Sequence, residues 1–154
     1  MSIQPLKINS SNFENAKLLK QIELLYQLIT ELATYNLSEN SYSVINQIII
    51  EINSFSIDEK ALTKLIKRRI TEIIAVLVKT EKITPHNYYR NQWMILGMSV
   101  FGIPMGVSFG LSLNNMAFLG IGLPIGMAIG IAIGQTMDKK AKDEGRQLQF
   151  KYEL

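Results

Sequence analysis

Residues 93–134 read WMILGMSVFGIPMGVSFGLSLNNMAFLGIGLPIGMAIGIAIG, and this stretch decides the fold. From Asn91 to Met137 the chain contains no Asp, Glu, Lys, Arg or His, whereas charged residues are frequent on both sides. Nine of the ten glycines also lie between Gly97 and Gly134. A change of composition this sharp within 154 residues indicates that the two parts of the chain are suited to two different solvents.

The uncharged stretch is long enough for two membrane-spanning helices. We predict a transmembrane hairpin over residues 84–137, with spans at about 93–112 and 116–134 and a turn at Leu113-Asn114-Asn115. A helix of about twenty residues covers roughly 30 Å, the hydrocarbon thickness of a bilayer. Because the connecting turn is short, the two helices are expected to be antiparallel.

The hairpin contains an internal repeat. Phe101–Gly110 matches Ile121–Gly130, with Gly, Pro, Gly and Gly in the same places. Spacing by four residues puts each set of glycines on one helix face, and a face without side chains lets two helix backbones approach closely. These glycines are the predicted helix-packing stripe: Gly102, Gly106, Gly110, Gly122, Gly126, Gly130 and Gly134.

Glycines and prolines inside a helix argue against a hairpin that is exposed to water. Each interior glycine costs a water-exposed helix about 1 kcal/mol relative to alanine, and each mid-helix proline costs about 3 kcal/mol. In hydrocarbon the backbone has to bond to itself, so the same sequence stays helical. Pro104 and Pro124 each release a carbonyl in mid-span, which predicts either a kink accommodated by packing, or a hinge or pore-lining position.

Residues that favour a membrane–water boundary flank the hairpin: Tyr88, Tyr89, Arg90 and Trp93 precede it, and Lys139 and Lys140 follow it. The turn carries neither Lys nor Arg, so the positive-inside rule predicts that both termini lie in the cytoplasm, with the hairpin in the inner membrane. The first residues, MSIQPLKINS, lack the apolar run of a signal peptide. We expect residues 138–154 to form a charged cytoplasmic tail that is a short helical extension.

Residues 11–83 are predicted to form a cytoplasmic bundle of three amphipathic helices, after a flexible tail at residues 1–10. Ser11–Glu14 and Ser56–Glu59 read as capping boxes, and Thr84-Pro85 reads as a further helix start. The fold class is therefore all-α, a three-helix bundle followed by a two-helix transmembrane hairpin. The expected apolar faces are Leu18, Ile22, Leu25, Ile29 and Leu32, then Ile45, Ile48, Ile49, Ile52 and Phe55, then Leu62, Ile66, Ile70, Ile73 and Leu77.

No pattern in the chain predicts catalysis, a metal or a cofactor. The chain has no cysteine, and its one histidine, His86, is interpreted as an interfacial residue. The glycines lack the lysine of a phosphate-binding loop, and the spans carry no ionisable group for a proton relay. The net charge of +3 comes from basic clusters beside the hairpin, which favours anionic lipid headgroups over nucleic acid as the partner.

At these residues the chain resembles the bacterial glycine-zipper membrane hairpin proteins. The resemblance implies a two-helix membrane module of prokaryotic source without a catalytic residue, and some small proteins of this kind assemble in or permeabilise membranes. It covers about Pro85 to Leu148 and does not extend to the first 80 residues. The residues that carry it are Asn87-Tyr88-Tyr89, Leu96-Gly97-Met98, the two repeated blocks at 102–110 and 122–130, Met137-Asp138-Lys139-Lys140 and Gly145-Arg146-Gln147-Leu148.

Two functions are compatible with these observations. The glycine stripes can close on each other within one chain or face neighbouring chains, and we expect the second arrangement, in which the chain forms a homo-oligomer. We expect such an assembly to act as a pore or to permeabilise the membrane. In the alternative, the hairpin only anchors an adaptor or immunity-type protein, and the helical bundle binds a cytoplasmic protein partner.

Overall fold

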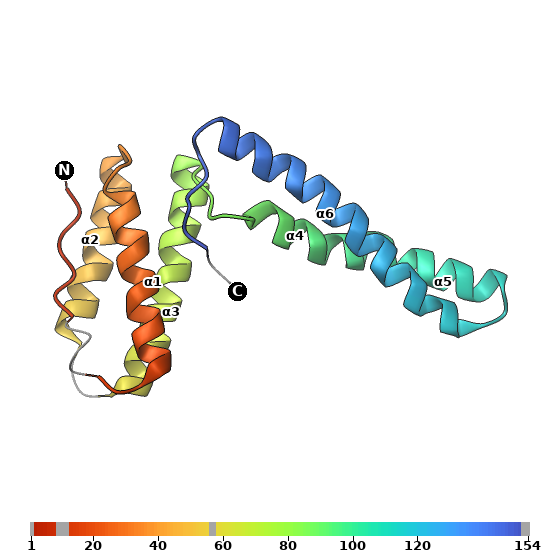
Figure 1. Ribbon diagram of the computed structural model, residues 1–154, viewed down its shortest axis with the longest axis horizontal. Coiled ribbons are helices and arrows are strands. Elements are labelled where there is room, and N and C mark those ends of the chain that lie inside the picture. Colours follow the sequence, from red (N-terminus) through yellow and green to blue (C-terminus); the bar gives the residue numbers. More distant parts are fainter. Residues whose placement is uncertain (1, 9–12, 56–57, 152–154) are drawn as a thin grey trace. The chain divides into compact units, whose positions relative to one another are not determined.

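The computed structural model describes residues 2–8, 13–55 and 58–151, which fall into two compact units. The first unit contains residues up to Thr84 together with Leu148–Phe150, and the second contains Pro85–Gln147. Helices form the framework of both units, and no β-strand occurs among the described residues (Figure 1). The predicted all-α class is therefore confirmed.

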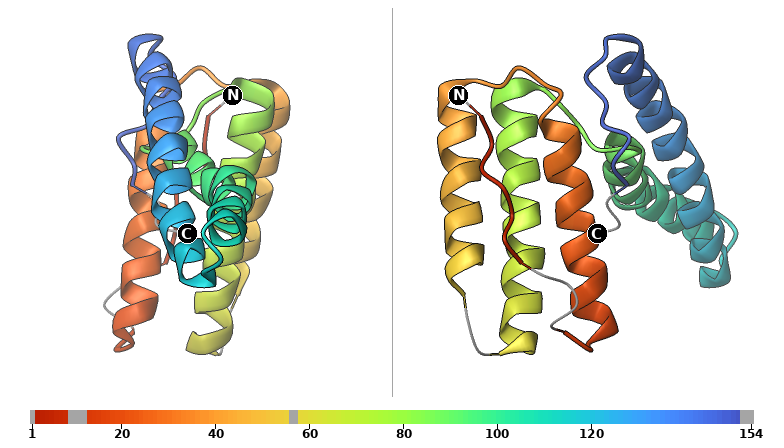
Figure 2. Two further views of the ribbon diagram at one scale, coloured as in Figure 1. Left: turned by 90° about the vertical axis from the view of Figure 1, so that its right-hand side faces the viewer. Right: turned by 60° about the vertical axis from the view of Figure 1, so that its left-hand side comes forward.

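The first unit is a bundle of three helices, α1 (Ala16–Leu32), α2 (Glu39–Ser54) and α3 (Glu59–Val76). A π-helical turn, η2 (Leu77–Glu81), continues α3. Helix α3 contacts both α1 and α2, and the right-hand view of Figure 2 shows the three helices side by side. Their apolar faces form the core, as predicted, with two differences. Leu28 is fully buried where Ile29 was expected, and Phe55 is 39% exposed.

Both predicted capping boxes in the bundle place the helix start wrongly. The Asn15 side chain caps α1 by accepting hydrogen bonds from the amides of Lys17 (3.0 Å) and Leu18 (3.4 Å). The Asp58 carboxylate caps α3 by accepting from Lys60 at 3.0 Å. Asn and Asp satisfy the free amides of a first turn as well as Ser does, and here they stand closer to the apolar run. Ser11 and Ser56 lie outside the described residues.

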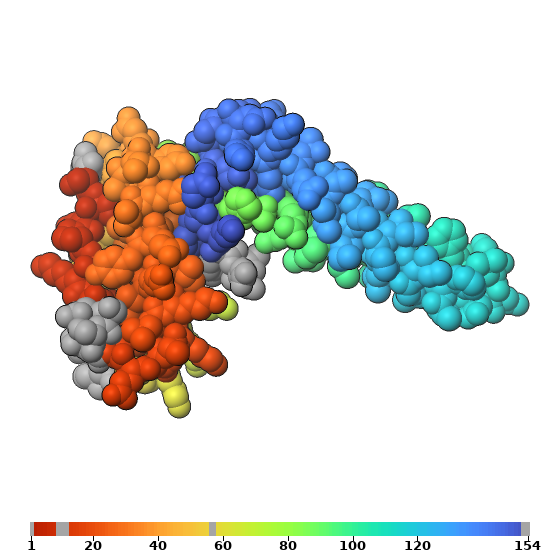
Figure 3. Space-filling model, viewed as in Figure 1, coloured from red at the N-terminus to blue at the C-terminus, as the bar shows by residue number. Residues whose placement is uncertain are grey.

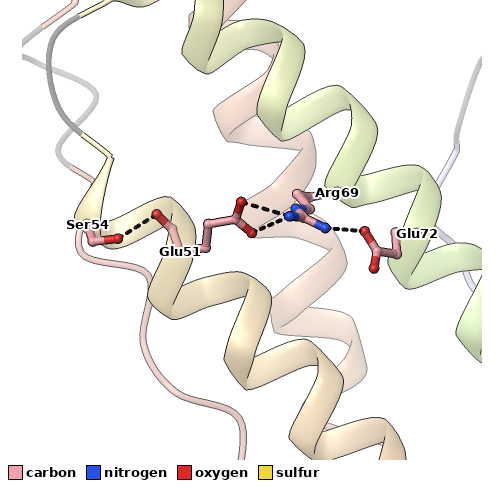
Figure 4. Close-up of polar contacts among 4 residues, drawn as sticks. All are labelled: Glu51, Ser54, Arg69 and Glu72. Carbon is pink, nitrogen blue, oxygen red and sulfur yellow. Dashed lines mark hydrogen bonds and ion pairs between the residues drawn. The ribbon is translucent and has the colours of Figure 1, made fainter.

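One arginine joins two helices of the bundle (Figure 4). The guanidinium of Arg69 on α3 donates to Glu51 on α2 at 2.7 Å and to Glu72 at 2.5 Å. These two hydrogen bonds raise the pKa of the Arg69 guanidinium. The charge of Arg69 is therefore matched by carboxylates within the bundle, although the sequence places it in a basic cluster.

A second polar contact holds the end of η2 against the start of α2. One oxygen of the Glu81 carboxylate accepts from the Ser38 hydroxyl (2.6 Å), the Ser38 amide (3.1 Å) and the Ser41 hydroxyl (2.5 Å). Burial raises the pKa of the Glu81 carboxyl, but the hydrogen bonds from Ser38 and Ser41 outweigh it and hold this pKa below its ordinary value of 4.5. The ionised form is therefore the one that the fold stabilises.

We predict that this contact makes the bundle sensitive to acid. Because the folded-state pKa of Glu81 is lowered, its stabilising contribution is complete at neutral pH and is lost as the pH falls through that pKa. Glu81→Gln should lower the melting temperature at about pH 7, and the difference from wild type should shrink towards about pH 3. Circular dichroism melts measure this, with the exposed Glu14→Gln as a control. An equal deficit at both pH values would contradict the assignment.

The chain segments at both ends of the sequence pack against the bundle. Residues 2–8 were predicted to belong to a flexible tail, but they lie against α2 with Leu6 buried. Near the other end, the Leu148 amide donates to the Thr84 carbonyl at 2.9 Å. The Glu31 carboxylate accepts from the amides of Gln149 (2.5 Å) and Phe150 (2.9 Å). Leu148 and Phe150 are buried, so residues 148–150 are part of the first unit's core.

The second unit is a helical hairpin. Its first arm, Tyr88–Ser112, joins α4 (Tyr88–Gly97), the π-helical turn η3 (Met98–Gly102) and α5 (Ile103–Ser112). Its second arm, Met116–Asp143, joins the short η4 (Met116–Phe118) to α6 (Leu119–Asp143). Both arms, of 25 and 28 residues, are long and apolar enough to cross a membrane, and an 18-residue stretch within each reaches a mean hydropathy of 1.8 and 2.2, respectively.

The turn and the ends of the hairpin differ in how well the sequence predicts them. Residues 113–115 form the turn, with Asn114 in the left-handed region at φ 52°, as expected. The predicted helix start at Thr84-Pro85 is wrong, because Tyr88 begins α4 after Asn87, which has φ 60°. The helical extension expected from residue 138 is confirmed as far as Asp143, where α6 ends, whereas residues 144–151 are not helical.

Candidate functional site: the glycine-packed hairpin

The two arms meet along their glycines, within one chain. A methyl group built on Gly122 would lie 2.6 Å from the Gly106 Cα, and one on Gly126 would lie 2.6 Å from the Gly102 Cα. At Gly134 it would lie 2.6 Å from the Tyr89 carbonyl oxygen. Real side-chain carbons do not approach backbone atoms this closely, so the α6 stripe is filled by the backbone of the first arm.

The glycines of the first arm make the reciprocal contacts. A methyl group on Gly106 would lie 2.9 Å from the Leu119 Cα, and one on Gly102 would lie 3.1 Å from the Leu123 Cα. At Gly110, next to the turn, a methyl group would lie 3.0 Å from the Met116 sulfur. Gly130 completes the α6 stripe, since a methyl group there would lie 2.7 Å from the Trp93 carbonyl carbon. All seven glycines of the predicted stripe therefore face the opposite arm or the residues next to the turn.

An eighth glycine belongs to this contact and escapes the sequence analysis. A methyl group on Gly97 would lie 2.8 Å from the Gly130 Cα. Gly97 precedes Gly102 by five residues, and a regular α-helix would turn it off the stripe. The π-helical turn η3, in which the Ile103 amide donates to the Met98 carbonyl, takes up the extra residue and returns Gly97 to the contact face. Pro104 follows directly and has no N–H, which is a local signal for such a turn.

The prolines and one glycine lie on the outside of the hairpin. Pro104 stands in the first turn of α5 and Pro124 lies inside α6, and both are exposed. Gly120, also exposed, has no atom within 4 Å of a built methyl group. The arms therefore meet through one set of residues, and the prolines face away from that contact.

A carboxylate closes the open end of the hairpin. Asp138 lies four residues after Gly134 on α6 and is only 6% exposed. Its Oδ1 accepts from the Tyr89 amide at 3.0 Å and its Oδ2 accepts from the Arg90 amide at 2.9 Å. The N-cap residue Asn87 makes no side-chain cap bond, so Asp138 caps α4 from the opposite arm, where the helix dipole favours negative charge.

This cap brings the predicted boundary residues to one end of the hairpin. Tyr88 and Tyr89 begin α4 with their rings edge to face, 5.3 Å apart. Lys139 and Lys140 follow Asp138 on α6 and are exposed, whereas Arg90 and Trp93 are half-buried on the first arm. Aromatic and basic side chains thus gather where the two arms open, and the opposite end has only the uncharged turn.

The outer surface of the hairpin is apolar. Only 22% of the most apolar window of the first arm and 17% of that of the second arm is buried. The exposed side chains include Ile95 at 58%, Leu111 at 64% and Met116 at 60%. Soluble proteins rarely expose apolar patches of this kind, and where they do the patch marks a surface that another molecule covers.

Between Asn91 and Met137, all of which the structure describes, the arms carry no Asp, Glu, Lys, Arg or His. Nδ1 of the half-buried His86 has no hydrogen-bond partner, and the described residues contain no cluster of three metal-ligating side chains. The site is therefore defined by shape and polarity: a glycine contact inside, an apolar surface outside and a polar, basic end. Searches against family models, curated proteins and solved structures found no match to the chain.

Proposed function

We propose that the chain is an integral membrane protein whose hairpin crosses the bilayer twice as a closed unit. The observation that supports this is the division of the hairpin into a glycine contact that occupies its inner faces and an apolar outer surface that neither arm covers. An arm of 25 residues extends roughly 37 Å at 1.5 Å per residue, enough for the hydrocarbon layer and part of each headgroup region.

The polar groups on the arms are compatible with lipid. The hydroxyls of Ser99, Ser108 and Thr136 donate to the carbonyl four residues earlier, at 2.9, 2.8 and 3.0 Å. Each hydroxyl is therefore paired within its own helix, which removes most of the free energy of burying it in hydrocarbon. Close backbone packing between glycine faces then stabilises the hairpin without a hydrophobic driving force between the arms.

In this proposal the open end of the hairpin, where both arms meet the rest of the chain, lies on the cytoplasmic side, and the turn lies on the opposite side. The aromatic and basic residues at the open end fit a headgroup region with anionic lipids. The turn at 113–115 carries no Lys or Arg that would keep it on the cytoplasmic side. The hairpin then anchors the helical bundle in the cytoplasm, where it is available to a protein partner. Such a two-helix membrane module is also what the resemblance to glycine-zipper hairpin proteins implies.

The absence of cysteine from the chain allows a direct test of this topology. Single-cysteine variants Leu113→Cys, in the turn, and Lys142→Cys, near the end of α6, place one thiol at each end of the hairpin. In spheroplasts a membrane-impermeant maleimide should label Leu113→Cys only, and after lysis it should label both. Labelling of both thiols in intact spheroplasts would rule out a crossing, and labelling of Lys142→Cys alone would reverse the orientation.

A second candidate function is self-assembly into a homo-oligomer that permeabilises the membrane. The internal contact uses the glycine stripes, so a second copy has to pack on the outer faces. Small residues follow one another there on both arms at helical spacing, and all are exposed: Ser99, Pro104, Ser108 and Ser112, then Gly120, Pro124, Ala128 and Ala132. Such a face permits close helix approach.

Self-assembly predicts a specific crosslinking pattern. Ser108→Cys lies on the small-residue face of the first arm, and Phe109→Cys is an exposed neighbour on the same helix. In liposomes under oxidising conditions, Ser108→Cys should form disulfide-linked dimers and Phe109→Cys should not. Dye leakage should accompany this if the assembly opens a pore. If both positions crosslink equally and liposomes at high protein density release no dye, self-assembly is contradicted and the hairpin is an anchor only.

A further inference from the structure

The N-terminal segment is held to the bundle through its backbone. The Asn46 carboxamide on α2 accepts from the Gln4 amide at 2.8 Å and donates to the Ser2 carbonyl at 3.1 Å. About two helical turns further along α2, the Asn53 carboxamide accepts from the Lys7 amide at 2.8 Å and donates to the Pro5 carbonyl at 3.2 Å. Each asparagine thus binds the carbonyl of one residue and the amide of the residue two positions later, as a neighbouring parallel β-strand would.

The spacing of the two asparagines matches a stretched-out peptide. Asn46 and Asn53 are seven residues apart on a helix, which places them roughly 10.5 Å apart along the axis. The groups that they bind are shifted by three residues, and an extended chain with three residues per turn, as in polyproline II, brings them back to the same side after roughly 9 Å. The two periods agree, so α2 presents a ladder of two carboxamides with the repeat of an extended backbone. Figure 1 shows the segment running along α2.

Helix α1 also contacts the segment, so residues 2–8 lie in a groove whose walls are α2 and α1. The Tyr26 hydroxyl lies 3.0 Å from the carbonyl oxygens of both Leu6 and Ile8, and it donates to one of them at a time. The right-hand view of Figure 2 looks onto this face, with the segment between α2 and α1 and α3 behind it. Within residues 2–8 only Leu6 is buried, at 8% exposure, and Ile3 and Ile8 are half-buried, whereas Ser2, Gln4, Pro5 and Lys7 are exposed. Atoms of the segment lie at the surface at the left edge of Figure 3.

We propose that the groove between α1 and α2 is a docking groove for an extended peptide with two apolar residues three positions apart, and that residues 2–8 are its tethered occupant. Among the described residues, the hydrogen bonds from the groove to residues 2–8 all go to the backbone, so the groove selects its ligand by extended shape and by the apolar residues at the positions of Ile3 and Leu6. The proposal concerns the first unit and stands independently of how the hairpin meets a membrane.

The pattern of hydrogen bonds predicts the peptide positions at which the groove can accept proline. The amides of residues 4 and 7 are used as donors, and the carbonyl of residue 5 is used as an acceptor. Proline has no N–H, so it is accepted at position 5, where the chain has Pro5, and excluded at positions 4 and 7. An incoming peptide also has to displace a tethered occupant whose effective concentration is of the order of millimolar.

The test uses the whole chain in detergent micelles, with residues 2–8 deleted, and a fluorescent peptide of sequence SIQPLKI. Fluorescence anisotropy should show saturable binding to the deleted chain and binding weaker by about tenfold or more to the intact chain, where the groove is filled. Asn46→Ala and Asn53→Ala in the deleted chain should each weaken binding by about tenfold, because each removes two hydrogen bonds to the peptide. Asn40→Ala, at an exposed position of the same helix, is the matched control and should leave binding unchanged.

Variants of the peptide distinguish recognition of its backbone from non-specific apolar binding. Gln4→Pro should abolish binding and Gln4→Ala should not, and Leu6→Ala should weaken it by removing the buried anchor. A deleted chain with unchanged helical circular dichroism and no saturable binding would overturn the proposal, as would binding that ignores Gln4→Pro. Should the deletion unfold the bundle, amide exchange in the intact chain decides: the amides of Gln4 and Lys7 should exchange by local opening, and exchange only on global unfolding would overturn the proposal.

Discussion

Gly126→Val is expected to force the two arms of the hairpin apart. The first carbon of the new side chain would lie 2.5 Å from the Gly102 nitrogen and 2.6 Å from the Gly102 Cα, and backbone atoms cannot yield as the end of a flexible side chain can. Overpacking of this kind costs about 1–3 kcal/mol, and we expect the upper part of that range because the clash is with backbone. Unfolding by SDS in mixed micelles, followed by circular dichroism, measures the loss.

Gly120→Val is the matched control for this prediction. It makes the same replacement in the same helix, but nothing lies within 4 Å of a methyl group at Gly120. Any effect of valine on helix propensity is shared by the two variants, so the difference between them reports the contact between the arms. We expect Gly120→Val to differ little from wild type. An equal loss of stability in both variants would show that the glycines act through the helix backbone alone.

Asp138→Ala should destabilise the open end of the hairpin. The change removes both hydrogen bonds from the carboxylate to the amides of Tyr89 and Arg90 and leaves these amides without a partner. A hydrogen bond to a charged group contributes about 1.5–3 kcal/mol, and we expect a loss of about 2–3 kcal/mol because the two bonds share one carboxylate. Asp138→Asn keeps a hydrogen-bond acceptor, so its stability should lie between those of wild type and Asp138→Ala. The same SDS titration measures all three proteins.

Asp143→Ala is the control for the Asp138 cap. Asp143 is exposed in the last turn of the same helix, where a negative charge is unfavourable to the helix dipole. Its removal should therefore leave the hairpin as stable as wild type or slightly more so. If Asp138→Ala behaves like Asp143→Ala, the contact between the arms does not depend on the cap.

Much of the architecture follows from local patterns in the sequence. The apolar residues of α1, α2 and α3 recur at helical spacing, so their burial can be predicted from each helix alone. The turn at residues 113–115 is also local, since two asparagines interrupt two apolar runs. Spacing by four residues places the α6 glycines on one face without any knowledge of their partner, and the structure puts the backbone of the first arm there.

The features that escaped the sequence analysis are the ones that join distant parts of the chain. Asp138 reads as the start of a charged tail because its partners, the amides of Tyr89 and Arg90, lie almost fifty positions earlier. The N-terminal segment reads as flexible because Asn46 and Asn53, which bind it, look like ordinary polar residues of α2. Gly97 breaks the spacing rule because a π-helical turn changes the number of residues per turn.

The internal glycine contact also changes how self-assembly has to be tested. In the closed hairpin the stripe glycines contact the opposite arm or the residues next to the turn, so a substitution there acts first on the fold of one chain. Substitutions on the outer small-residue faces act on contacts between copies, if these form. Variants of the two kinds should therefore be compared for both hairpin stability and crosslinking before a loss of activity is assigned to assembly.

Alkaline carbonate extraction of membranes that contain the chain tests the central proposal most directly. A hairpin that crosses the bilayer should stay in the membrane pellet after carbonate washing and enter solution only with detergent. If the chain instead appears in the carbonate supernatant and is monodisperse by size-exclusion chromatography in detergent-free buffer, the apolar outer surface of the hairpin must be covered by protein, and the membrane proposal is wrong.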